Sequence, residues 1–108
     1  MPSSNSGGAK QWASAAYTAS AAGSSSETAT LPSGQTGRPS ILRVSGSVSG
    51  EVVLTYGNAA QIIAPVNPNA QYTDIQIPAS AFPAPTGSVT MTLTADGAGV
   101  IRALIGFQ

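Results

Sequence analysis

The chain has 108 residues, which is enough for one domain with a modest hydrophobic core. Charged side chains make up only 7% of it and cancel to zero net charge, so we expect no nucleic-acid partner, because such a partner requires clustered Lys and Arg. The sequence contains no His and no Cys, which excludes imidazole bases, thiol nucleophiles, disulfides and His- or Cys-based zinc sites within one chain.

Residues 1–23 consist almost wholly of Ser, Ala, Gly, Asn and Thr, so this stretch can bury little surface. We therefore expect a low-complexity N-terminal arm over residues 1–23 and a folded domain over residues 24–108. Residues 11–22 fit a short alanine-rich helix and fit an extended strand about equally, and the conformation of the arm stays open. Its aromatic residues, Trp12 and Tyr17, either fold back onto the domain or anchor in a neighbouring subunit.

From residue 24 onward, short runs of alternating apolar and polar residues are separated by Gly, Pro, Asn and Ser. These runs predict strands over residues 27–31, 41–48, 51–56, 61–64, 72–77, 88–95 and 100–107. The clearest alternation places Val89, Met91, Leu93 and Ala95 inward against outward threonines. Strands of this number and spacing, without a long helix, predict an all-β antiparallel β-sandwich, a class that includes jelly rolls.

Three segments of the second part carry a resemblance: Ser24-Ser-Ser-Glu-Thr-Ala-Thr-Leu-Pro32, Gly37-Arg38 and Ile41-Leu-Arg-Val-Ser-Gly-Ser-Val-Ser-Gly50. They resemble small β-sandwich virion structural proteins of tailed bacteriophages, over residues 24–108. The resemblance implies a capsid-decorating or minor head subunit, or a tail-fibre module. It also implies assembly into the virion in the host cytoplasm, with other virion proteins and copies of the chain as partners. No functional residue carries over from it.

Four carboxylates are the remaining candidates for acid–base or metal chemistry: Glu27, Glu51, Asp74 and Asp96. Asp96 precedes Gly97 in a predicted turn, while Glu51 and Asp74 alternate with apolar residues as solvent-facing strand positions. No two of the four lie close together in the sequence. We therefore expect no catalytic residue, no cofactor and no metal site, calcium included. No apolar run is long enough to span a bilayer, so we also expect no membrane partner.

Tyr72 and Phe82 flank a proline-bounded connection and form a candidate sugar-stacking or protein-contact patch, although either ring can also cap the end of the core. The leading hypothesis is a non-enzymatic virion structural protein that forms oligomers. Its candidate partner-binding residues are Trp12, Tyr17, Tyr72 and Phe82. The alternative is a carbohydrate- or receptor-binding module of a tail fibre or adhesin, with a glycan as partner. A polymer-forming scaffold subunit is a third hypothesis.

Overall fold

Strands account for most of the chain in the computed structural model, which describes residues 10–57 and 60–108. In chain order they are β1 (Gln11–Ala19), β2 (Gly23–Thr30), β3 (Pro39–Gly46), β4 (Gly50–Tyr56), β5 (Ala60–Val66), β6 (Thr73–Gln76), β7 (Ser88–Ala95) and β8 (Gly99–Phe107). A 3-10 turn, η2 (Ala79–Ala81), lies between β6 and β7. None of the described segments is a helix long and apolar enough to cross a membrane.

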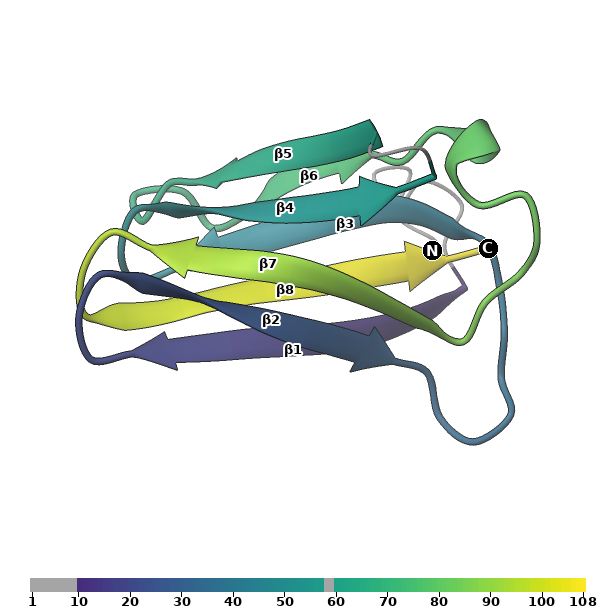
Figure 1. Ribbon diagram of the computed structural model, residues 1–108, viewed down its shortest axis with the longest axis horizontal. Coiled ribbons are helices and arrows are strands. Elements are labelled where there is room, and N and C mark those ends of the chain that lie inside the picture. The colour runs from purple at the N-terminus through teal and green to yellow at the C-terminus, as the bar shows by residue number, and fades with distance from the viewer. Residues whose placement is uncertain (1–9, 58–59) are drawn as a thin grey trace.

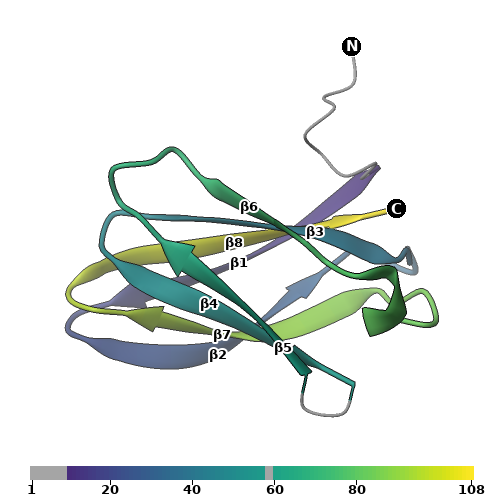
Figure 2. The same cartoon turned by 90° about the horizontal axis from the view of Figure 1, so that it is seen from above.

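The strands form two antiparallel sheets that pack face to face (Figures 1 and 2). Sheet A has the order β1-β8-β3-β6, and sheet B has the order β2-β7-β4-β5. The pairs β1/β8, β2/β7, β3/β6 and β4/β5 are all antiparallel, as in a chain folded in half between β4 and β5 and then rolled up. This is the topology of a jelly roll. The predicted β-sandwich is confirmed, and its strand order is that of the jelly roll.

Residues 11–22 belong to the sandwich, so the predicted boundary between arm and domain at residue 23 is wrong. β1 pairs with β8 along its whole length, from Gln11 opposite Phe107 to Ala19 opposite Gly99. Of the two conformations predicted for residues 11–22, the extended strand is therefore correct and the helix is wrong. The physical reason lies in the core, where large side chains of other strands fill the space and buried methyl groups such as that of Ala13 complete the packing. Residues 1–9 of the predicted arm lie outside the described residues.

Several other strands differ in extent from their predicted ranges, among them β3, which was predicted over residues 41–48 and spans Pro39–Gly46. β2 begins at Gly23, earlier than the predicted start at residue 27, because its polar residues pair fully with β7. β5 continues to Val66 and includes Pro65. Proline is tolerated there because β5 is an edge strand of sheet B and needs no hydrogen-bond donor on its free side.

The hydrophobic core fills the space between the two sheets. Its largest fully buried side chains are Phe107, Leu42, Leu54, Met91, Leu93, Ile101 and Ile105. Complete burial of an aliphatic or aromatic side chain of this size stabilises the fold by about 1.5–3 kcal/mol. The inward row predicted for β7 is confirmed, since all four of its members are buried. This core fixes which side chains of each strand point outward, and thereby sets the composition of the two outer faces.

Candidate functional site

The outer face of sheet A brings together two aromatic residues that are far apart in the sequence. Trp12 lies on β1 and Tyr72 immediately precedes β6, and both contact Arg43 of β3. The guanidinium carbon of Arg43 is 5.0 Å from the centroid of the Trp12 ring and 4.2 Å from that of the Tyr72 ring. Both distances lie within cation–π range. The guanidinium thus joins the two rings into one cluster.

Asp74 holds this guanidinium in place from the neighbouring strand. Arg43 and Asp74 lie directly opposite each other in the β3/β6 pair. Arg43 Nε donates to Asp74 Oδ1 at 2.8 Å and Nη2 donates to Oδ2 at 3.0 Å, a bidentate contact. The two side chains are only 23% and 19% exposed, so the pair is partly shielded from solvent. Hydrogen bonding to Asp74 raises the pKa of the Arg43 guanidinium above its ordinary value, and the group stays charged.

A glycine lies between the strands that carry the cluster. Trp12 is opposite Gly106 in the β1/β8 pair, and Ile41 is opposite Gly106 in the β3/β8 pair. Gly106 has no side chain, which leaves room over β8 between the two larger residues. Ile41 lies two positions before Arg43 on the same strand, is fully buried, and is not part of the core between the sheets. The outer face of sheet A therefore includes a buried apolar side chain, Ile41, two positions from Arg43.

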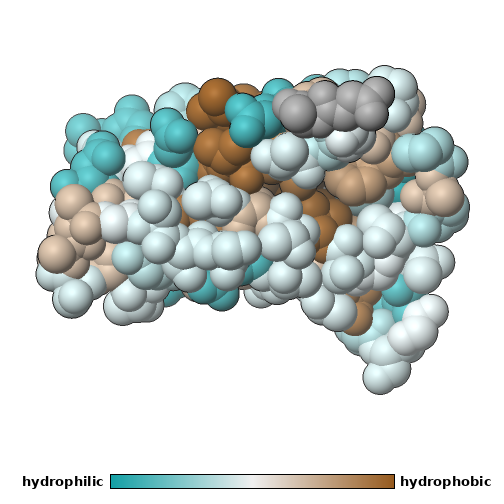
Figure 3. Space-filling model, viewed as in Figure 1, coloured by the Kyte–Doolittle hydropathy of each residue, from teal (hydrophilic) through white to brown (hydrophobic). Residues whose placement is uncertain are grey.

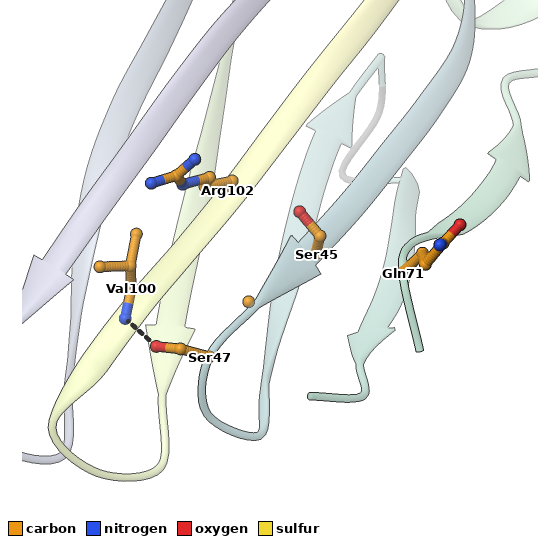
Figure 4. A pocket seen from close by; sticks show the side chains of 6 residues that line it. Ser45, Ser47, Gln71, Val100 and Arg102 are labelled. Carbon is orange, nitrogen blue, oxygen red and sulfur yellow. Dashed lines mark hydrogen bonds between the residues drawn. The ribbon is translucent and has the colours of Figure 1, made fainter. Parts of the chain in front are cut away.

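A shallow hollow adjoins the cluster where β3 leads into the turn toward β4. It has a volume of about 360 Å³ and is lined by Ser45, Gly46, Ser47, Gln71, Val100 and Arg102. Figure 4 shows Arg102 and Gln71 extending to opposite sides, with the Ser45 hydroxyl between them. Ser47 Oγ accepts a hydrogen bond from the Val100 amide at 2.9 Å (Figure 4). This bond holds β8 and the end of β3 together at the edge of the hollow. Within the described part of the chain, Arg102 makes no ion pair.

The hollow and the cluster form one continuous surface. Gln71 and Tyr72 are consecutive, and Arg102 lies opposite Ser45 in the β3/β8 pair. Arg102 is therefore a diagonal neighbour of Arg43, a relation in which Cα atoms are roughly 7–8 Å apart. We call this surface the outer site. It comprises Trp12, Arg43, Ser45, Gln71, Tyr72, Asp74 and Arg102.

The outer site offers flat aromatic faces beside several hydrogen-bonding groups. Indole and phenol rings stack on apolar ring faces, while guanidinium, amide, carboxylate and hydroxyl groups bind polar substituents at the edge. The described residues bring no three His, Cys, Asp or Glu side chains together as a metal-binding group. The rings and the polar groups together suit a ligand that has both an apolar face and a polar rim.

The four sequence-predicted partner residues fall into two groups. Trp12 and Tyr72 belong to the outer site. Tyr17 lies on the inner side of β1, is partly buried and packs against the core, so it folds back onto its own domain. Phe82 also packs against the core, with its ring centroid 6.1 Å from that of Tyr56.

Tyr72 and Phe82 do not meet as the candidate patch, and Phe82 instead packs against the core, as in the alternative of a ring that caps the core. β6 separates the two residues, since Tyr72 immediately precedes this strand and Phe82 follows η2 beyond its end. The aromatic residue that lies near Tyr72 is Trp12, because the rings of both contact the guanidinium of Arg43. The sequence contained a partial signal for the cluster around Arg43, because Arg43 and Asp74 have opposite charges and both occupy outward positions of their strands. Their pairing depends on strand order, which local alternation does not determine.

Comparisons with known proteins give no family for this chain. No protein-family model matches it, and no curated protein matches it either. Among solved structures, a mutant of the family 29 carbohydrate-binding module CBM29-2, studied for its mechanism of ligand recognition, shows a TM-score of 0.38 at 11% identity. That match covers 90% of this chain and 79% of the other. A similarity at this level carries no argument about the function of this chain.

Proposed function

We propose that this chain is a non-catalytic carbohydrate-binding domain that recognises a sugar chain on the outer face of sheet A. The observation that carries the proposal is the convergence of Trp12 and Tyr72 around Arg43, next to a polar hollow. A sugar ring presents a C–H face that stacks on an aromatic ring and hydroxyls that exchange hydrogen bonds with polar side chains. Tyr72 is 44% exposed, so its ring is accessible for such stacking.

The shape of the outer site favours a polymer over an enclosed small molecule. A pocket for a small ligand is a deep concavity that buries most of the ligand surface. Here the hollow is shallow, and the site continues across the sheet through Arg43 to Trp12 on the edge strand β1. A sugar chain lying across the strands can therefore place one unit over Tyr72, another near Trp12 and its substituents in the hollow.

The substitution Tyr72→Ala is expected to weaken binding of the recognised glycan by at least tenfold, which corresponds to about 1.4 kcal/mol, because an aromatic stacking anchor is lost. A glycan array that contains neutral and acidic oligosaccharides identifies the ligand, and titration calorimetry measures the loss. Ile63→Ser is the matched control, since Ile63 is 54% exposed on the opposite sheet. Wild-type affinity in the Tyr72→Ala variant, or an array without any bound glycan, contradicts the proposal.

A second candidate function is that of a virion structural subunit, whose partners are other virion proteins and copies of the chain. The jelly roll is shared by viral capsid and lectin domains, so the fold does not choose between the two. The observation that favours this candidate is the outer face of sheet B, where exposed hydroxyl side chains line β2 and β7. They are Ser24, Ser26, Thr28, Thr30, Ser88, Thr90 and Thr92.

Ile63, an exposed large hydrophobic residue, lies on the same sheet, on edge strand β5, with β4 between it and the hydroxyl rows. Figure 3 shows that brown areas lie beside the paler surface of this side of the molecule. Of the described residues that point outward from sheet B, only Glu51 is charged. A nearly uncharged surface can pack against a copy of itself without burying unpaired charges.

If this face mediates assembly, the purified chain forms a defined oligomer in size-exclusion chromatography with light scattering. Ile63→Asp is then expected to dissociate the oligomer, because it places a charge on the exposed apolar position of this face. Ile63→Val is the matched control and should preserve it. A monomeric wild-type chain, or an oligomer that Ile63→Asp leaves intact, contradicts this second candidate.

A further inference from the structure

The outer site holds one guanidinium whose charge is balanced and one whose charge is not. Arg43 is neutralised by the bidentate contact with Asp74. Arg102, its diagonal neighbour, is exposed, and the described residues provide it with no ion pair. The site as a whole therefore carries an excess of one positive charge, located at the hollow.

The strands around Arg102 present no carboxylate to it. Ala16 of β1 and Ser45 of β3 are its cross-strand neighbours, and both are uncharged. The hollow is lined by serines, glycine, valine and glutamine besides Arg102 itself. Asp96 lies in the turn between β7 and β8 at this end of the sandwich, but it does not line the hollow. The exposed guanidinium therefore faces a neutral, hydrogen-bonding environment.

Such a guanidinium is suited to a planar anion. Its fork of N–H donors matches the two oxygens of a carboxylate, and a bidentate contact of this kind is both stronger and more specific than one to a neutral group. Across the strand pair, the Ser45 hydroxyl offers a further hydrogen-bond donor to the same ligand group. Tyr72, next to Gln71 of the hollow, supplies the stacking surface alongside.

We infer that the outer site selects an acidic sugar chain, in which a uronic acid carboxylate binds Arg102 while a sugar ring stacks on Tyr72. This inference rests on the proposed carbohydrate-binding function and adds the class of sugar. Arg43 and Arg102 thus have different roles. Arg43 supports the aromatic rings, and Arg102 recognises the charge of the ligand.

The test uses the full chain and matched pairs of probes: tetramers of galacturonate, mannuronate and guluronate, and the methyl ester of each. Esterification removes the carboxylate charge and keeps the sugar. For at least one sugar, the acid is expected to bind at least tenfold more tightly than its ester. This preference should decline as salt rises from low to about 0.5 M, because the contact is partly exposed and is screened.

Arg102→Gln is expected to abolish the preference and to bring the affinity for the acid down to that for the ester. Arg102→Lys should retain part of it, since the charge remains and the fork is lost. The matched control is Arg38→Gln, because Arg38 lies outside the outer site and hydrogen-bonds to Gln108. Thermal unfolding followed by circular dichroism verifies that each variant is folded.

The outcomes separate the inference from the proposed function. If acids and esters bind equally and Tyr72→Ala weakens both, the inference is overturned and the proposed function stands. A preference for acids that persists in Arg102→Gln also overturns the inference. If no neutral or acidic glycan binds, the proposed function fails, and the inference fails with it.

Discussion

Deletion of residues 1–19 is expected to abolish folding, whereas deletion of residues 1–9 is expected to leave a cooperatively folded domain. The longer deletion removes β1, which pairs with the whole of β8. β8 then becomes an edge strand, and its inward side chains Ile101, Ile105 and Phe107 become exposed to solvent on the side from which β1 is removed. The backbone hydrogen bonds of the β1/β8 pair are lost as well. We expect these losses to cancel most of the ~5–15 kcal/mol that stabilises a typical domain.

Urea unfolding followed by circular dichroism measures this effect in the full chain and in both deletions. The shorter deletion is the control, because every described strand begins after residue 9. The full chain and the shorter deletion should unfold cooperatively, and the longer deletion should give no cooperative transition or should aggregate through its new edge. A longer deletion that unfolds like the full chain shows that residues 11–19 are a dispensable arm.

Arg43→Ala is expected to lower the free energy of unfolding by about 1–2 kcal/mol and to weaken glycan binding by at least tenfold. Each cation–π contact at an exposed site contributes roughly 0.5–1 kcal/mol, and Arg43 makes two. The substitution also leaves the partly shielded Asp74 carboxylate without its partner. Binding suffers because Trp12 and Tyr72 lose the group that holds their rings in place.

Two further variants separate the causes of this effect. Arg43→Lys keeps the charge but cannot form the bidentate contact, so it should lie between wild type and Arg43→Ala in stability and binding. In a double-mutant cycle with Asp74→Asn, the two substitutions should be non-additive, because the side chains contact each other directly. Full stability and full affinity in Arg43→Ala contradict the role assigned to this residue.

Local sequence patterns predicted most of the sandwich because alternation is a local property. The inward row of β7 and the outward positions of Arg43 and Asp74 follow from period-two spacing alone. The same spacing was present in residues 11–19, but their inward residues are mainly alanine, which gives a weak hydrophobic contrast. The strand was therefore indistinguishable from a short helix or an arm. Its partner, β8, lies at the other end of the chain.

The outer site could be predicted only in part, because it is assembled by strand order. Trp12 and Tyr72 are predicted partner-binding residues, whereas Arg43 and Arg102 lie far apart in the sequence and belong to no basic run. The jelly roll places β3 and β8 side by side and adds β1 and β6 on either side of them. Only this order brings both arginines and both aromatic rings onto one face. No local pattern contains that information, since the residues that meet are separated by much of the chain.

The fluorescence of Trp12 during titration with tetragalacturonate, and with any glycan that the array identifies, tests most directly whether a sugar binds at the outer site. Trp12 is the single tryptophan of the chain, so its emission reports on the outer site alone. We expect a saturable change in emission for a bound glycan, and a curve shifted to at least tenfold higher concentration in the Tyr72→Ala variant. A glycan whose binding is measured by calorimetry but leaves the emission of Trp12 unchanged contradicts sugar binding at the outer site, because the sugar then binds elsewhere on the molecule.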